Sequence, residues 1–238
     1  MEQLVFELAP PEPPRLANFL PGRNAELIAA LTSFVSGASR ETGLLIWGAP
    51  GAGKTHLLSA AAAVARERGI EASVFTNAAA PVDPARVEAG TLFVIDRVDE
   101  AGEADAGRIF TLYNALRERG GKLLAASRLP LASLPLREDL RTRLGWGLVY
   151  EILPLADEDK PEALKVYARR RGLELPADVV DYLLRHGRRD MQSLLSTLNA
   201  LDRVSLAAKR PITVPLLREW LQKELEWERA QSTSTRRG

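Results

Sequence analysis

Short apolar runs alternate with longer amphipathic stretches over the first part of the chain. The runs predict buried strands, and stretches with an apolar residue at every third or fourth position predict helices. The expected strands are 44–47, 72–75, 92–96, 122–127 and 148–152, and the expected helices are 24–35, 54–68 and 106–119. Because strands alternate with helices, the pattern indicates an α/β fold with a parallel sheet flanked by helices on both faces.

The pattern changes after Pro154, where only helical periodicity continues. Helices are expected at 157–171, 177–185, 191–204 and 214–227. We therefore predict an α/β domain at 19–153 and a small all-helical domain at 154–228. The polar residues 229–238 are expected to form a disordered tail.

The residues before the α/β domain carry a separate signal. Residues 9–18 form a proline-rich linker, and stacked prolines favour an extended polyproline conformation. In the peptide 1–8, Leu4, Phe6 and Leu8 would project to the same side of an extended chain. The peptide is therefore either an edge strand or a docking peptide that binds a pocket of another protein.

A glycine-rich loop joins the first expected strand to its helix. Its residues are Gly48, Ala49, Pro50, Gly51, Ala52, Gly53, Lys54 and Thr55. In such a P-loop the backbone amides turn inward, the lysine reaches the terminal phosphates and the hydroxyl can hold Mg²⁺. The loop predicts binding of ADP or ATP with Mg²⁺, and His56, the next residue of the helix, is included in the predicted site.

The strand 92–96 ends in Asp96, which is the second magnesium ligand that a P-loop site needs. Many hydrolysing P-loop proteins carry another acid directly after it, and here that position holds Arg97. Asp99 is the nearest substitute. The sequence therefore supports nucleotide binding more strongly than hydrolysis in the protein's own site.

Arginines at two places could serve phosphate chemistry, because a guanidinium offers planar, bidentate donors. Of Arg188 and Arg189, expected at the start of a helix in the second domain, Arg189 is the preferred contact to nucleotide in the same chain. Arg143 precedes the last strand and could face a neighbour's nucleotide. An arginine supplied in trans can raise phosphoryl-transfer rates by roughly 10³- to 10⁵-fold. The alternative at both places is a solvated surface arginine.

Composition excludes several classes of protein. The chain has no cysteine, which rules out disulfides and thiolate metal sites. A net charge of +1 gives no overall attraction to nucleic acid or to a membrane. The start of the chain lacks the features of an export signal, and no stretch is long enough to span a membrane. We expect a cytoplasmic protein with no membrane partner.

These features together resemble the AAA+ family, and within it the DnaA-related group to which Hda belongs. Besides the P-loop, the resemblance is carried by residues 140–147, 153–160, 169–176 and 198–202. It implies an arginine finger at Arg143, sensor II at Arg189 and sensor I at Ser127. It also implies that Phe19 and Asn24 lie near the adenine.

The resemblance further implies partners. Gln3, Leu4, Phe6 and Leu8 are similar to the peptide that binds the sliding clamp, the beta subunit of DNA polymerase III. Only a short tail is expected after the helical lid, where DnaA has a DNA-binding domain, so DNA contact should be indirect or weak. A homo-oligomer is also allowed.

The implied function is negative regulation of the initiation of replication near the nucleoid and replisome. An Hda-type protein, normally holding ADP, stimulates hydrolysis of the ATP bound to DnaA. Such a protein acts as a regulator more than as an efficient ATPase. The alternatives are a DnaC-like helicase loader that hydrolyses its own ATP, or another DnaA paralogue that docks on a different protein.

Overall fold

The computed structural model describes residues 13–78 and 87–223. They divide into two units, with the boundary between Pro154 and Leu155. The predicted clamp-binding residues 3–8, the first part of the linker and the predicted tail 229–238 lie outside the described residues. Within the described ranges, no helix is both long and apolar enough to cross a membrane.

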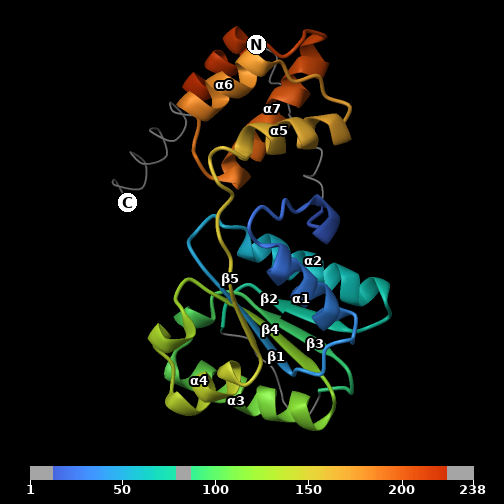
Figure 1. Ribbon diagram of the computed structural model, residues 1–238, viewed down its shortest axis with the longest axis vertical. Helices are drawn as coiled ribbons and strands as arrows, with labels where there is room; N and C mark the ends of the chain where they lie inside the picture. The colour runs from blue at the N-terminus through green and yellow to red at the C-terminus, as the bar shows by residue number, and fades with distance from the viewer. Residues whose placement is uncertain (1–12, 79–86, 224–238) are drawn as a thin grey trace, which may run out of the picture. The chain divides into compact units, whose positions relative to one another are not determined.

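The first unit is built on a five-stranded parallel sheet with the strand order β2-β3-β4-β1-β5 (Figure 1). The strands are β1 Gly43–Trp47, β2 Ala72–Phe75, β3 Leu92–Ile95, β4 Lys122–Ser127 and β5 Leu148–Glu151. Because all the strands run in the same direction, their carboxyl ends open on one edge of the sheet. Open α/β sheets bind ligands at this edge.

Helices cover both faces of the sheet (Figure 1). They are α1 Ala25–Val35, α2 Lys54–Glu67, α3 Glu103–Glu118 and α4 Glu138–Gly145. Successive side chains of a strand point to opposite faces. Leu44 and Ile46 of β1 accordingly pack in the core beneath α1 and α2, whereas Leu45 packs in the core beneath α3 and α4. The predicted α/β fold is confirmed.

The sequence pattern does not predict α4. Only Leu140 and Leu144 of its eight residues are buried apolar positions, and they lie one helical turn apart. Two positions are too few to establish a period. The segment expected to be a connection before the last strand is therefore a helix, and it carries Arg143.

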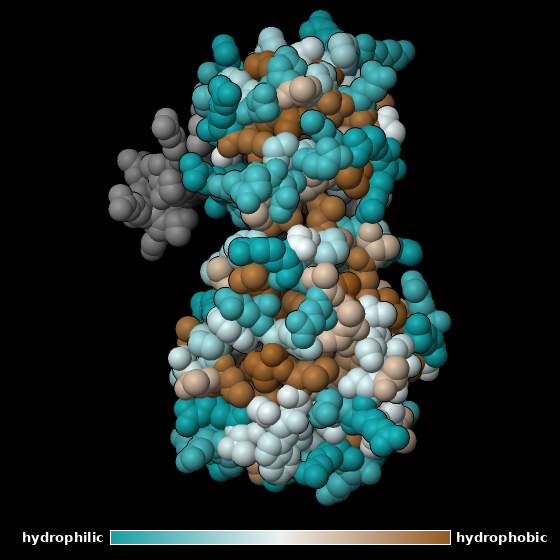
Figure 2. All heavy atoms as spheres, viewed as in Figure 1, coloured by the Kyte–Doolittle hydropathy of each residue, from teal (hydrophilic) through white to brown (hydrophobic). Residues whose placement is uncertain are grey.

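The second unit is all-helical, as predicted. It contains α5 Lys160–Arg170, α6 Ala177–His186, α7 Met191–Ala208 and helical residues 214–223. Its own core includes Leu164, Leu183 and Leu198. On the face drawn in Figure 2, hydrophobic residues gather in patches within each unit and hydrophilic residues surround them.

Asn24 ties the start of α1 to the chain that leaves β5. Its Nδ2 donates to Leu153 O at 2.8 Å, and its Oδ1 accepts from Leu153 N at 2.8 Å. Asn24 is only 5% exposed, so water does not readily replace these two bonds. The connection leading out of the sheet unit is thereby fixed beside α1.

Asn24→Ala is expected to destabilise the protein by about 2–4 kcal/mol, because two buried main-chain groups of Leu153 lose their partners. Urea unfolding at constant nucleotide concentration measures the loss. Asn18→Ala is the matched control, since Asn18 also bonds two main-chain groups, Arg15 N and Pro13 O, but in an exposed setting. The control should cost less than about 0.5 kcal/mol. Equal losses in the two variants would contradict the shielded role of Asn24.

Candidate nucleotide-binding site

The glycine-rich loop connects the end of β1 to the start of α2. Gly51 and Gly53 have φ angles of 77° and 100°, a left-handed region that glycine adopts readily. Gly48 approaches the chain after β5 so closely that a Cβ atom there would lie 2.5 Å from Ile152 O. The shape of the loop therefore requires glycine at these three positions.

Lys54 begins α2 and reaches back over the loop. Its Nζ donates to Gly48 O at 2.6 Å and to Ala49 O at 2.8 Å, and the residue is 8% exposed. Burial lowers the pKa of Lys54, while the nearby carboxylates of Asp96 and Asp99 act to raise it. A buried ammonium on a glycine-rich loop is suited to meet the terminal phosphates of a nucleotide.

Thr55 and Asp96 are brought together although they lie 41 positions apart in the sequence. Thr55 Oγ1 donates to Asp96 Oδ2 at 2.6 Å. Asp96 follows β3 and is 9% exposed. A hydroxyl and a carboxylate are oxygen ligands of the kind that Mg²⁺ prefers, so the pair fits this ion. Nowhere in the described ranges do three or more His, Cys, Asp or Glu residues form a metal cluster, and Mg²⁺ commonly completes its shell with phosphate and water.

Arg97 is directed away from this pair. Its φ angle of 51° is unusual for a residue other than glycine. Its Nε and Nη2 donate to Thr76 O, just beyond β2, at 3.1 and 2.8 Å, and Nη1 lies 3.4 Å from Glu100 Oε2. The position after Asp96 therefore supplies neither an acid nor a free cation to the site.

Asp99 is held by Arg128, a residue that the sequence analysis did not identify. The Asp99 side chain is 1% exposed; it accepts from Arg128 Nε at 2.7 Å and from Arg128 N at 3.2 Å. Burial raises the pKa of Asp99, but the hydrogen bonds from Arg128 outweigh burial and the net shift is downward. Asp99 is thus an ionised carboxylate whose two oxygens are both engaged.

Ser127, the predicted sensor I, uses its side chain in a local turn. The hydroxyl donates to Leu129 O at 2.8 Å and accepts from Leu129 N at 2.9 Å. Ser127 O accepts from Gly48 N at 3.2 Å, which joins the end of β4 to the P-loop. The polar side chain that extends from this strand end is that of Arg128, half-exposed and also paired with Glu100.

Phe19 lies against Gly53 of the P-loop and beside His56, the third residue of α2. Phe19 Cε2 would be 2.8 Å from a Cβ placed on Gly53, and the ring centroids of Phe19 and His56 are 5.8 Å apart. His56 Nε2 is 3.1 Å from Arg15 O. Burial lowers the pKa of His56, and the hydrogen bond to Arg15 only partly opposes this. Asn24 is close in sequence to Phe19, but its amide is already bonded to Leu153.

Arg143 lies on α4 beside aromatic rings. Its Cζ is 4.0 Å from the ring centroid of Trp146 and 5.3 Å from that of Phe110. Its Nε is buried and finds no hydrogen-bond partner in the described part of the chain. Within the described residues, Arg143 forms no hydrogen bond or ion pair with Lys54, Thr55 or Asp96.

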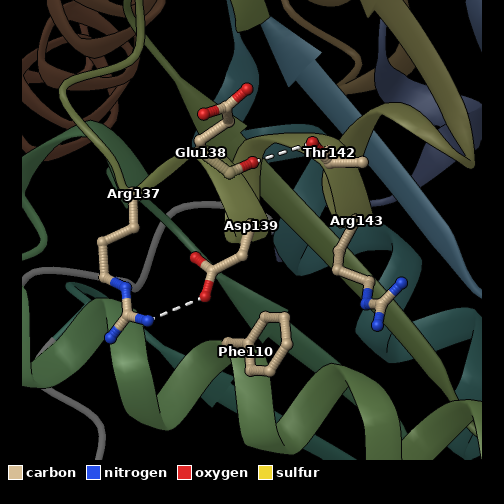
Figure 3. A pocket seen from close by; sticks show the side chains of 6 residues that line it. All are labelled: Phe110, Arg137, Glu138, Asp139, Thr142 and Arg143. Atoms are coloured by element: carbon tan, nitrogen blue, oxygen red, sulfur yellow. Dashed lines mark hydrogen bonds and ion pairs between the residues drawn. The ribbon is translucent and has the colours of Figure 1, made fainter.

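A cavity of about 600 Å³ opens beside Arg143 (Figure 3). It is lined by Phe110, Arg137, Glu138, Asp139, Thr142 and Arg143. Arg137 pairs with Asp139 at 2.8 Å, whereas Arg143 has no carboxylate partner in the ranges that the structure describes. The cavity therefore contains a guanidinium with free donor capacity.

Arg189 belongs to the second unit. It lies in the turn before α7 and not at the start of the helix, which begins at Met191 because the Asp190 side chain caps it by accepting from Ser193 N at 2.9 Å. Arg189 O accepts from Lys160 Nζ at 2.6 Å, and the same ammonium donates to Asp157 at 2.6 Å. Lys160 is 9% exposed, so a buried lysine fixes the backbone at Arg189.

Comparison with known proteins identifies the fold and the lid. Residues 157–221 match the family model described as the lid domain of Hda. Domain III of DnaA from Thermotoga maritima has a TM-score of 0.73 and 18% identity, over 88% of this chain and 95% of that one. DnaA from Aquifex aeolicus bound to AMPPCP has a TM-score of 0.65 and 24% identity, over 79% of this chain. The RuvB branch-migration motor of Thermotoga maritima has a TM-score of 0.66 and 18% identity, over 88% of this chain and 72% of that one.

The solved structures establish the AAA+ fold, and their low identity establishes nothing more specific. This chain spans 65% of the length of the AMPPCP-bound DnaA. The lid match is more specific, and over residues 157–221 it confirms the resemblance to Hda. The predicted AAA+ fold with a helical lid is therefore correct.

The Asp99–Arg128 pair should make stability depend on pH. The folded pKa of Asp99 lies below its ordinary value of 3.8, so the stabilisation is present above about pH 4 and is lost as the pH falls through the folded pKa. In Arg128→Gln, Asp99 loses the hydrogen bond and the charge of the guanidinium, while burial continues to raise its pKa. The variant should therefore be less stable than the wild type at neutral pH, and the difference should narrow in acid.

Urea midpoints of both proteins at about pH 7 and about pH 3.5 measure this difference. The double variant Asp99→Asn with Arg128→Gln is the control, because it removes the buried Asp99 charge together with its partner. Its difference from the wild type at neutral pH should be smaller than that of Arg128→Gln. A difference between Arg128→Gln and wild type that stays constant with pH would refute the proposed pairing.

Proposed function

We propose that this chain, whose lid matches that of Hda and whose sheet unit has the AAA+ fold, is a negative regulator of replication initiation. In this proposal it holds a nucleotide in its own P-loop and promotes hydrolysis of the ATP bound to DnaA, which leaves inactive DnaA-ADP. The observation that carries the proposal is Arg143, a guanidinium beside a cavity with no carboxylate partner in the described part of the chain.

The chain's own nucleotide, ADP or ATP, has a mainly structural role in this proposal. Lys54 would contact the terminal phosphates, and Thr55 with Asp96 would hold Mg²⁺, which when bound would neutralise phosphate charge. Phe19 and His56 border the loop. Arg97 is bonded to Thr76 O, and Asp99 is bonded to Arg128, so neither is free to orient water. Slow hydrolysis in the chain's own site is therefore expected.

Arg143 acts on the partner's nucleotide. As the γ-phosphoryl group is transferred, negative charge spreads over its oxygens, and donors placed there in advance lower the barrier. The guanidinium supplies such donors without a proton transfer. Since Arg143 forms no ion pair among the described residues, no carboxylate has to be displaced before it meets phosphate.

The N-terminal peptide brings the chain to its partner in this proposal. Gln3, Leu4, Phe6 and Leu8 bind the sliding clamp, and the proline-rich linker joins that peptide to the AAA+ body. A linked contact makes the next encounter effectively intramolecular and raises the local concentration of the regulator near DNA-bound DnaA. A DnaC-like loader would instead hydrolyse its own ATP when given DNA and would not need this peptide.

Arg143→Ala should lower the rate at which this chain makes DnaA hydrolyse its bound ATP by about 10³-fold, or down to the basal rate of DnaA alone if that is reached first. Binding of ADP to the chain should remain unchanged. Phosphate release from ATP-loaded DnaA, measured as the chain is titrated, gives the rate. Arg137→Ala is the matched control, because Arg137 lines the same cavity but pairs with Asp139, and it should keep the stimulation. Undiminished stimulation by Arg143→Ala would rule out the finger assignment.

Gln3→Ala and Leu4→Ala should each weaken binding to purified sliding clamp by about 30-fold, the usual effect of removing an anchor residue. Val5→Ala is the control for Leu4→Ala, since in an extended peptide Val5 would project to the side opposite Leu4, Phe6 and Leu8. Surface-immobilised clamp and the full chain with bound ADP provide the measurement. If the intact chain does not bind the clamp, the tether part of the proposal is wrong and the loader alternative gains support.

A further inference from the structure

Trp146 is a large aromatic side chain at the end of α4, one helical turn after Arg143. Its main-chain N donates to Arg143 O at 3.2 Å and closes the last turn of the helix. Its indole lies 4.0 Å from Arg143 Cζ, and 48% of the residue is exposed. The same residue is therefore linked to Arg143 through both its backbone and its ring.

The backbone around Trp146 is held tightly. A Cβ atom on Gly147 would overlap Gly43 O at the start of β1, and a Cβ on Gly145 would lie 3.0 Å from Leu131 Cδ2. Both neighbours of Trp146 are thus packed against other parts of the sheet unit. The indole stands on a fixed base and can serve as a rigid surface for the guanidinium.

The way Arg143 is held leaves its hydrogen-bonding capacity available. An arginine in an ion pair has its donors engaged, but one held against aromatic faces keeps them free. No oxygen in the described ranges accepts a hydrogen bond from Arg143 Nε, and the Phe110 ring also lies near the guanidinium. Arg117 of α3 also lies 5.0 Å from the Trp146 ring, so two guanidinium groups share one half-exposed indole. Guanidinium donors on this ring can bind an anionic ligand such as a phosphate chain.

We propose that Trp146 is the positioning residue that holds the Arg143 guanidinium ready for a phosphate group presented by another AAA+ protein. An unrestrained arginine loses much rotamer freedom when it docks on phosphate. That entropy loss reduces the net stabilisation that the arginine gives to the transition state. The Trp146 ring restricts Arg143 before the partner arrives. This inference rests on the proposed role of Arg143.

The first test examines the free protein and needs no partner. In the chain labelled with ¹⁵N-arginine, NMR relaxation of the Arg143 side chain should report an ordered guanidinium in the wild type. Trp146→Leu removes the aromatic face and should make Arg143 mobile, whereas Trp146→Phe keeps a face and should preserve its order. Far-UV circular dichroism and ADP binding verify that both variants are folded. An Arg143 side chain as ordered in Trp146→Leu as in the wild type would overturn the inference.

The second test uses the stimulated hydrolysis of ATP on DnaA and separates maximal rate from half-saturating concentration. Trp146→Leu should lower the maximal rate by roughly 2- to 30-fold, the range expected for a cation–π contact, and leave the half-saturating concentration within about twofold. Trp146→Phe should recover most of the rate. A wild-type maximal rate in Trp146→Leu would show that the ring does not position the arginine.

The two tests separate the inference from the proposed function. If the wild-type chain fails to stimulate hydrolysis, the proposed function fails, and the NMR comparison still decides whether Trp146 holds Arg143. If Arg143→Ala abolishes stimulation while Trp146→Leu has no effect, the function stands and the positioning role of Trp146 falls.

Discussion

A buried ammonium at the start of α2 is the constraint on which the rest of the candidate nucleotide site depends. Lys54 is almost fully enclosed, and a buried charge is costly unless polar groups surround it. Two carbonyl oxygens of the P-loop accept hydrogen bonds from its Nζ, and the carboxylates of Asp96 and Asp99 lie close enough to raise its pKa against the effect of burial. The loop, the end of β3 and the segment after it are therefore organised around one positive charge.

The acids and arginines of the sheet unit fall into two groups, one near Lys54 and one on α4. Near Lys54, one acid bonds Thr55 and the other is neutralised by Arg128, which leaves the chain's own site well equipped for binding and poorly equipped for activating water. On α4, in contrast, Arg143 is held by rings and forms no ion pair within the described residues. The side chains proposed to bind nucleotide in cis and the arginine proposed to act in trans therefore form separate sets.

The sequence predicts the fold well because the main signals are local. Buried strands such as 122–127 appear as apolar runs, and the glycines of the P-loop have a fixed spacing. Helix α4 is not predicted, because only Leu140 and Leu144 form its buried apolar face. The Asp99–Arg128 pair could not be predicted either, because it joins residues 29 positions apart through the packing of β3 beside β4. Nor does the sequence show that the Ser127 hydroxyl is already bonded within its own turn.

The contact between His56 and Arg15 has a mechanical consequence. Arg15 lies in the second half of the predicted linker 9–18, and it contacts α2 through His56 and through Glu67. The first residue of that helix is Lys54. Tension applied along the N-terminal segment would therefore be transmitted to α2, the element that begins at the phosphate loop. A load on this segment and the loop proposed to hold the phosphates would thus be mechanically linked through one helix.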